Sequence, residues 1–423
     1  MPHEGLLTSR NTRSLGVFCL RQQGYQSKIF DEAMRGLGAN ERAIIERIPI
    51  LPLRKFAAGM VRAKMRVQFT GWLQYLLPLI FILILALLAG VSQLLKISFL
   101  VSSFSTLGYL ILLIALFDLV TVKFKIRPPE RLPQRNDDLD LFDLMRSRHS
   151  CRSFQTRKLT EADHAELMTS VQRHLDEPKI GKPPIRFEYI SAPLTVWPVV
   201  NATEFLVAIA PKEYNRLSVI DVGRSLQKVV MDATRMGLGT CWIGPGADHA
   251  SIMQTLGERF DPEKDHIICV LAIGYKSKYI PLFIRLFNRQ MSTNRLPLSE
   301  LFFAASTFTT PLDVNAAPFN RFGRNYEICQ WAPSSYNGQT TRCAAVTDEK
   351  GTLKSFDFYA ATASQYYAPV ALGIWAANWE MGCAALRIEG HFDVRSSEET
   401  QSSLPRYDLS WYSPRTSFDV YCP

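Results

Sequence analysis

Two long apolar runs, separated by a single lysine, constrain this chain more than any other feature of its sequence. No charged residue occurs from Val67 to Leu95, and a second uncharged run extends from Ile97 to Phe117. About 20 apolar residues cross the hydrocarbon core of a bilayer as one helix. A single long span would place Lys96 inside the membrane at a cost of about 3 kcal/mol. We therefore predict a transmembrane helical hairpin at 67–122 (helices near 72–95 and 97–119) and disfavour two buried helices of a soluble domain.

Basic residues on both flanks of the hairpin predict its orientation. Lysine and arginine outnumber aspartate and glutamate by twelve to five in residues 1–71, which accounts for most of the formal charge of +9. Lys123, Lys125 and Arg127 follow the second run, and positive charge marks the cytoplasmic side of a membrane protein. We expect an integral membrane protein whose body faces the cytosol, or the matrix if the membrane is mitochondrial. No motif that binds nucleic acid accompanies this charge, so we expect the lipid bilayer as the partner.

The regions around the hairpin are less informative. Residues 1–66 form a basic segment, in which 11–28 loosely resembles a targeting sequence and 31–47 suits an amphipathic helix on a membrane. Trp72 and Tyr75 are either interfacial anchors or neighbours of another helix. Residues 123–138 are polar and proline-rich, which is typical of a linker. Because 423 residues exceed the usual size of a single core, we expect more than one folded unit after the linker.

The eight cysteines and seven histidines indicate no metal site and no disulfide framework. The cysteines show no paired short spacing, and no histidine lies at zinc-ligand spacing from them. The sequence also shows no serine–histidine–aspartate grouping. We therefore expect a reduced compartment, buried cysteines and a reaction that is not carried by a metal.

A basic motif at the start of the body is a candidate phosphate site. Apolar residues at helical spacing over 139–148 lead directly into Arg148-His149-Ser150-Cys151-Arg152. Arginine offers a planar fork of donors and serine a hydroxyl, and both suit a phosphate dianion. Alternation in an extended segment would place Arg148, Ser150 and Arg152 on one side. Basic residues at a helix end also simply complement the helix dipole, so the motif alone is weak evidence.

Four further pieces follow this motif in order. Residues 221–233 have helical spacing and lead to a glycine-rich stretch, 236–244, in which Gly237 marks the helix end. Residues 267–275 read as a buried strand that ends in glycine. The remaining pieces are the segments Asn294-Arg295-Leu296-Pro297 and Ala332-Pro333-Ser334-Ser335-Tyr336-Asn337-Gly338-Gln339.

This ordered set resembles the nitroreductase family, and the resemblance covers about residues 139–395. It implies an α+β fold that binds FMN between two halves of a dimer. Here the two halves of the flavin signature lie far apart in one chain, and residues 367–383 resemble a diverged repeat of residues 221–239. The resemblance therefore implies two fused, diverged copies (139–302 and 303–395) that form an intramolecular pseudo-dimer, followed by a tail (396–423). One flavin site per chain is expected, and two sites are the alternative.

The resemblance also implies which residues hold FMN. The phosphate would be bound by Arg148, Ser150, Arg152 and Arg295, with His149 beside them. The backbone of Trp242, Ile243 and Gly244 would lie against the ring, and the other half would contribute Pro333, Ser334, Ser335, Asn337 and Gln339.

The implied activity is a ping-pong hydride transfer from NADH or NADPH through FMN to an electron-poor small molecule. The flavin carries the chemistry, so no side chain is singled out as catalytic. A specialised flavin reaction such as reductive dehalogenation is a rival within the fold. The rival from another class is a non-catalytic, flavin-binding or empty, membrane scaffold.

Overall fold

The computed structural model describes residues 45, 47–68, 71–194, 196–244, 247–292, 294–395 and 403–413. The chain divides into two compact units, Met1–Leu73 and Gln74–Pro423. In the first unit the structure describes the helix α3 (Leu51–Gln68), most of which lies in the basic segment predicted for 1–66. The possible targeting sequence at 11–28 lies outside the described residues, as does most of the possible helix at 31–47.

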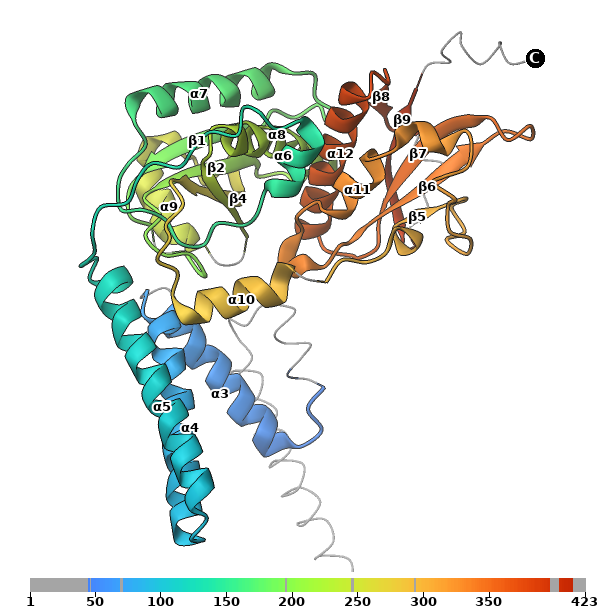
Figure 1. The fold of residues 1–423 in the computed structure, drawn as a ribbon. Helices are drawn as coiled ribbons and strands as arrows, with labels where there is room; N and C mark the ends of the chain where they lie inside the picture. Colours follow the sequence, from blue (N-terminus) through green and yellow to red (C-terminus); the bar gives the residue numbers. More distant parts are fainter. Residues whose placement is uncertain are drawn as a thin grey trace, which may run out of the picture. The chain divides into compact units, whose positions relative to one another are not determined.

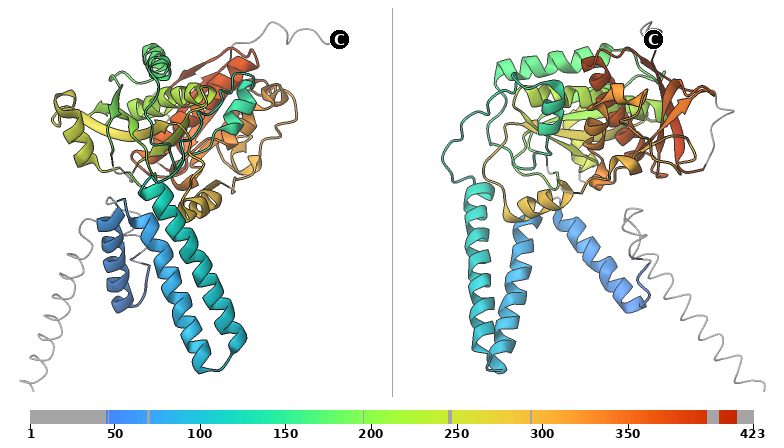
Figure 2. Two further views of the ribbon diagram at one scale, coloured as in Figure 1. Left: turned by 60° about the vertical axis from the view of Figure 1, so that its left-hand side comes forward. Right: turned by 45° about the vertical axis from the view of Figure 1, so that its right-hand side comes forward.

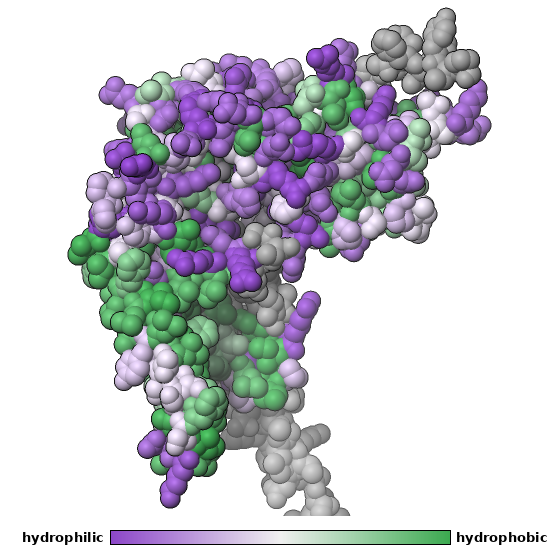
Figure 3. All heavy atoms as spheres, viewed as in Figure 1, coloured by the Kyte–Doolittle hydropathy of each residue, from purple (hydrophilic) through white to green (hydrophobic). Residues whose placement is uncertain are grey.

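The hairpin consists of α4 (Leu73–Leu94) and α5 (Ser98–Asp118), and α5 continues into a π-helical turn, η1 (Leu119–Lys123). Both helices are long and apolar enough to cross a membrane by length and composition. Figure 3 shows hydrophobic side chains gathered over this hairpin, whereas hydrophilic ones dominate the visible face of the body. Tyr75 is buried with Val122 and Val200, so it packs between the base of the hairpin and the body.

The first half of the body is a four-stranded antiparallel sheet with a long helix (Figure 1). The strand order is β1-β2-β4-β3, and α8 packs on the sheet through one large apolar cluster. Helix α8 begins where Asn215 accepts a hydrogen bond from the backbone N–H of Ser218. It stops before Gly237, whose φ of +82° suits glycine. The elements are α6 (Leu141–Ser147), α7 (Glu161–Asp176), β1 (Arg186–Ser191), β2 (Glu204–Pro211), α8 (Arg216–Arg235), β3 (Gly239–Ile243), α9 (His249–Leu256), η2 (Gly257–Arg259) and β4 (Asp265–Gly274).

A connection leads from β4 to the second half. It contains α10 (Leu282–Ser292), η3 (Leu298–Glu300) and the short strand β5 (Phe302–Phe303). Strand β5 joins the second sheet beside β6, and its pairing is parallel. The end of the first half therefore completes the edge of the second.

The second half repeats the topology of the first. Its sheet has the order β5-β6-β7-β9-β8, so β6-β7-β9-β8 matches β1-β2-β4-β3, and α12 takes the place of α8. Strand β9 lies in the segment predicted as a tail, but it is an inner strand between β7 and β8. The copy thus extends beyond 395. The elements are η4 (Phe319–Phe322), α11 (Asn325–Gln330), η5 (Ser335–Asn337), β6 (Thr341–Thr347), β7 (Leu353–Ala360), α12 (Tyr367–Ala385), β8 (His391–Asp393) and β9 (Arg406–Tyr412).

The two halves meet through α8 and α12, which lie side by side in both views of Figure 2. A β-carbon added to Gly373 would lie 2.0 Å from the carbonyl oxygen of Ile220, so the helices approach as closely as backbones allow. Beside this crossing, Arg224 of α8 forms a two-pronged ion pair with Glu380 of α12. This contact between α8 and α12, called the seam below, therefore fixes the position of one half against the other.

Candidate functional site at the junction of the two halves

Arg148 is a buried cation at the end of α6. Asp140 caps the start of this helix by accepting a hydrogen bond from the backbone N–H of Asp143. Arg148 then leaves the helix in an extended conformation (φ −67°, ψ 119°) and is 9% exposed. Its Nη1 atom has no hydrogen-bond partner among the described residues. Burial, and then the nearby charge of Arg295, lower the pKa of Arg148 to about 10.

Arg295 brings a second guanidinium to the same place from the connection between the halves. Its Nη1 donates to the carbonyl oxygen of Ala332 (3.0 Å), and its guanidinium lies over the ring of Trp331 (5.2 Å to the centroid). Its Nε is buried without a hydrogen-bond partner among the described residues, and burial lowers the pKa of this side chain. Arg295 thus links the two motifs: its charge acts on Arg148 of the first motif, and its guanidinium is hydrogen-bonded to Ala332 of the second.

Arg152 is the third guanidinium of the cluster. Its Nη1 donates to the side-chain carbonyl of Asn288 on α10 (2.6 Å), and its backbone carbonyl accepts from Val200 (2.9 Å). Its charge adds to the positive potential at Arg148. Residues Arg148, Arg152 and Arg295 are called the arginine cluster below.

The arginine cluster fits an anion. Within the described part of the chain, neither Arg148 nor Arg295 forms an ion pair with a carboxylate, whereas Arg127, Arg216 and Arg224, whose side chains are also largely buried, do. A buried cation without a counter-charge is costly, and a phosphate dianion would supply both the charge and the hydrogen-bond acceptors. The phosphate end of FMN therefore suits this place.

The other residues of the first motif lie along β3. Ser150 forms a parallel backbone bridge with Thr240, and Cys151 donates its N–H to the Thr240 carbonyl. Gly239 leaves room for this approach, since a β-carbon there would lie 2.7 Å from the Cys151 sulfur. His149 is exposed, and its Nδ1 donates a hydrogen bond to the carbonyl of Ser147.

The end of β3 touches the second half. Trp242 is half-buried and Ile243 is buried, and the indole N–H of Trp242 has no hydrogen-bond partner among the described residues. A β-carbon at Gly244 would lie 3.0 Å from the ring of Tyr367 at the start of α12. The predicted ring-facing backbone thus lies at the junction, although Pro245 and Gly246 fall outside the described residues.

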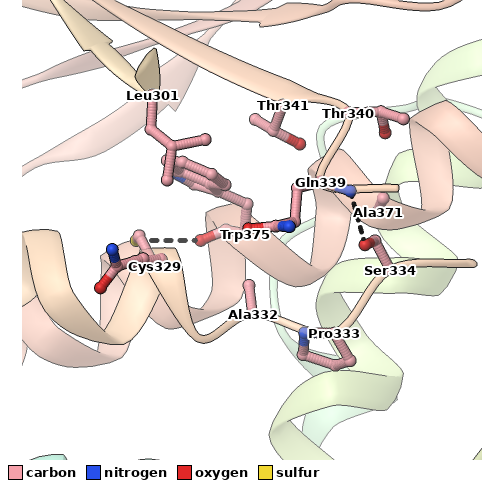
Figure 4. Close-up of a pocket in the computed structure, with 11 residues that line it drawn as sticks. Leu301, Cys329, Ala332, Pro333, Ser334, Gln339, Thr340, Thr341, Ala371 and Trp375 are labelled. Atoms are coloured by element: carbon pink, nitrogen blue, oxygen red, sulfur yellow. Dashed lines mark hydrogen bonds between the residues drawn. The ribbon is translucent and has the colours of Figure 1, made fainter. Parts of the chain in front are cut away.

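The second motif forms a tight loop after α11. Tyr336, Asn337 and Gln339 have φ values of +52°, +55° and +45°, which side chains other than glycine rarely adopt. The Ser334 hydroxyl closes the loop by accepting the N–H of Gln339 (2.9 Å; Figure 4). Such local strain persists where the surroundings fix the backbone, and it is frequent at ligand sites.

The two amides of this loop hold the backbone on both sides of Arg295. Asn337 Nδ2 donates to the Asn294 carbonyl (2.7 Å), as does Gln339 Nε2 (3.1 Å). Gln339 Oε1 accepts the N–H of Leu296 (2.8 Å). In this structure these side chains position Arg295, and the direct contact with FMN that the resemblance implies stays a prediction. Their spacing in the sequence gave no signal of this role.

Beside the loop lies a small cavity (Figure 4). It separates Pro333 and Ser334 from α12, where Ala371 and Trp375 form its other wall. This places the predicted ring-contacting serine and proline next to open space within the second half.

The second half offers no phosphate cluster of its own among its described residues, because its basic residues near the corresponding place form other contacts. Arg324 pairs with Asp140 and Asp143, and Arg321 Nη2 donates to Ser413. No group of three or more histidine, cysteine, aspartate or glutamate residues suits a metal ion among the described residues. The described part of the chain thus has one cluster of arginines that suits a phosphate.

Taken together, the fold and the site define an α+β protein with two halves of the same topology and, at their junction, a cluster of arginines that suits an anion. The sequence profile of the family described as "Putative TM nitroreductase" matches residues 140–382. This match covers more than half of the chain, and the chain therefore belongs to that nitroreductase family, which comprises FMN-dependent oxidoreductases.

Solved structures give more distant similarities. A protein described as a "putative nitroreductase" from Thermotoga maritima is 16% identical, with 68% of this chain and 97% of that chain covered and a TM-score of 0.41. A nitroreductase with bound FMN from Bacteroides fragilis is 13% identical, with 33% and 90% covered and a TM-score of 0.27. A "putative nitroreductase" in complex with FMN from Desulfovibrio desulfuricans is 18% identical, with 38% and 94% covered and a TM-score of 0.28. None of the curated proteins compared with the chain matches it.

Proposed function

We propose that this protein is a membrane-anchored, FMN-dependent NAD(P)H oxidoreductase. The observation that carries the proposal is the arginine cluster, in which the buried Arg148 and Arg295 lack carboxylate partners within the described residues. Family membership supplies the chemistry that such a cluster would serve. Two segments about 150 residues apart converge on one anion site, which argues against coincidental surface charge.

The proposed role of each residue follows from its place. Arg148, Arg152 and Arg295 bind the phosphate, and the Ser150 hydroxyl donates to it. The backbone at Trp242–Gly244 and the loop with Pro333, Ser334 and Ser335 enclose the ring from the two halves. Bound FMN would take a hydride from NADH or NADPH and pass electrons to an electron-poor small molecule.

Burial of the arginine cluster at this junction strengthens its binding of a phosphate dianion. Charge-assisted hydrogen bonds strengthen where water is excluded, so a cluster that is costly when empty binds a dianion tightly. Because the first half contributes the cluster and the second half the loop, we propose one flavin site in each chain. The chain then needs no second copy to complete the site.

The hairpin is the proposed membrane anchor. Helices α4 and α5 have the length and composition of spans, and many of their apolar side chains are exposed. Basic residues on both flanks favour a body on the cytosolic side, or in the matrix of a mitochondrion. The acceptor therefore meets the enzyme at a membrane surface.

The test is the absorbance spectrum of the full-length protein purified in detergent, with its flavin-to-protein ratio. We expect a yellow protein with one FMN per chain that is bleached by NADH or NADPH under nitrogen. Arg148→Gln should lose FMN, whereas the control Arg324→Gln should keep it, because Arg324 is exposed and paired with Asp140 and Asp143. A colourless protein that takes up no added FMN would instead be a membrane scaffold.

A further inference from the structure

Helix α10 connects the base of the hairpin to the arginine cluster. At its start, Asp118 at the end of α5 accepts a hydrogen bond from the backbone N–H of Leu282 (2.7 Å). Two turns further on, Asn288 accepts the hydrogen bond from Arg152 (2.6 Å). Figures 1 and 2 show α10 lying across the end of the hairpin, along the adjoining edge of the body. One short helix thus touches both the proposed anchor and the proposed cofactor site.

The two faces of α10 differ in chemistry. Ile284 is fully buried and Asn288 is half-buried, so this face packs on the body. On the outer side of the helix Arg285, Leu286 and Arg289 are exposed, and Leu286 is 57% exposed. Helical spacing places both arginines on the same side of Leu286. An exposed leucine beside two arginines is typical of a helix in a membrane interface, where the apolar side chain enters the lipid and the basic groups reach the headgroups.

Exposed apolar side chains continue along the chain past the end of the hairpin. Phe124 and Ile126, which follow the hairpin, are both exposed, and Lys125 lies between them. This segment repeats the alternation of apolar and basic groups seen on α10. Anionic headgroups attract such basic residues at about 1 kcal/mol each. Residues 124–126 thus follow the proposed membrane span directly, α10 is hydrogen-bonded to the end of that span, and both carry the charge that complements an anionic leaflet.

We propose that the outer face of α10 lies in the anionic headgroup layer of the bilayer that holds the hairpin, and that this contact stabilises FMN through Asn288 and Arg152. This inference rests on the proposed membrane insertion and FMN site. Lipid contact fixes α10, α10 fixes Asn288, and Asn288 holds the Arg152 guanidinium in place. The membrane then acts as a positive regulator of cofactor retention.

The first experiment places a fluorescent probe on α10. Full-length protein with Leu286→Cys is labelled with an environment-sensitive dye and reconstituted in phosphatidylcholine–phosphatidylglycerol vesicles that carry nitroxide-labelled lipid. Met253→Cys on α9 is the matched control, since Met253 is also an exposed apolar residue (37%) but lies on the body. The unsubstituted chain is treated with the same dye, and its fluorescence gives the contribution of the native cysteines. We expect several-fold stronger quenching at position 286 than at position 253.

The second experiment measures the release of FMN. The unsubstituted protein should release FMN about tenfold more slowly in anionic vesicles than in detergent, the scale of one or two basic residues at such a surface. Leu286→Glu should abolish this difference, because a carboxylate is repelled by anionic headgroups, whereas Met253→Glu should preserve it. Neither residue belongs to the arginine cluster, so FMN binding in detergent should be unchanged in both variants.

The outcomes separate this inference from the proposals on which it rests. Equal quenching at positions 286 and 253 in protein that floats with the vesicles would overturn the α10 contact and leave the anchor intact. A probe at position 286 that is shielded from water but not quenched by the lipid would indicate a protein partner instead. Absence of FMN in both detergent and vesicles would contradict the proposed function itself, whatever the probe reports.

Discussion

A β-carbon added to Gly223 would lie 3.1 Å from the Cα of Gly373, at the crossing of α8 and α12. The two glycines belong to helices that hold the same place in the two halves. Their contact lets the helix backbones touch, which sets the distance between the first motif and the loop of the second. The arginine cluster depends on that distance, because Arg295 must reach both Arg148 and the Ala332 carbonyl.

Alanine at either glycine should destabilise the body. A β-carbon at Gly223 would lie 2.3 Å from the carbonyl oxygen of Val370, and backbone cannot move aside cheaply. We expect a loss of about 1–3 kcal/mol in the free energy of unfolding, measured by thermal or denaturant unfolding. Gly90→Ala is the control, because nothing lies within 4 Å of its added β-carbon. Equal effects of Gly223→Ala and Gly90→Ala would contradict a tight seam.

Replacement of Arg148 should have opposite effects on cofactor binding and on stability. Its pKa is lowered to about 10 by burial and by Arg295, so at neutral pH the protein carries the cost of keeping it charged. That cost is present at every pH below 10, and Arg148→Gln should stabilise the flavin-free protein by about 1–3 kcal/mol. The melting temperature of the flavin-free protein reports this.

Inorganic phosphate provides the control for the Arg148 prediction. It should raise the melting temperature of the unsubstituted flavin-free protein by binding to the arginine cluster, and it should not do so in Arg148→Gln. A variant that melts at a lower temperature and still responds to phosphate would show that Arg148 lies outside the anion site.

The loop amides should act on FMN through Arg295. Because Asn337 and Gln339 hold the backbone at Asn294 and Leu296, Asn337→Ala should weaken FMN binding about tenfold by loosening Arg295. In Arg295→Gln the same substitution should have little further effect. A double-mutant cycle on the FMN dissociation constant measures this coupling. Additive losses would instead favour direct contact of Asn337 with the flavin.

The seam ion pair should make stability depend on acid pH. Burial opposes ionisation of Glu380, but hydrogen bonds and charge from Arg224 and Lys228 outweigh it and lower its pKa. A carboxyl group whose pKa is lowered by folding stabilises the folded protein at pH values above its usual pKa of 4.5. This contribution is lost as the pH falls through the folded-state pKa.

Glu380→Gln tests this prediction. At pH 7 the variant should unfold at a lower temperature, since the buried Arg224 loses its partner. Below pH 4.5 its stability should fall less steeply than that of the unsubstituted protein. Glu263→Gln is the control, because Glu263 pairs with Lys212 at the surface, where an ion pair contributes little. Parallel pH profiles for Glu380→Gln and the unsubstituted chain would rule out this role for Glu380.

Local pattern predicted much of the architecture. Uninterrupted apolar runs predicted helices where the structure has α4 and α5, and helical spacing predicted the centre of α8. A buried apolar run predicted β4, and Gly237 was correctly predicted as the end of a helix. Each of these features depends on residues that are close together in the sequence, and so the local sequence pattern is enough to predict it.

The segment after 395 shows where local pattern failed. Residues 406–412 have the alternation of a strand, with Leu409 and Trp411 facing the main core of the second half, but polar surroundings gave them the appearance of a tail. Only the pairing of β9 with β7 and β8, which are distant in the chain, makes them an inner strand.

The sequence by itself determined that the chain has two membrane-type helices, a body of nitroreductase type and a basic motif suited to phosphate. The tertiary structure decided which arginines converge, that Asn337 and Gln339 brace Arg295, and that α10 links the cluster to the hairpin. The physical reason is that these relationships are contacts between segments up to 164 residues apart. Periodicity records which face of an element is buried, but not which distant segment covers it.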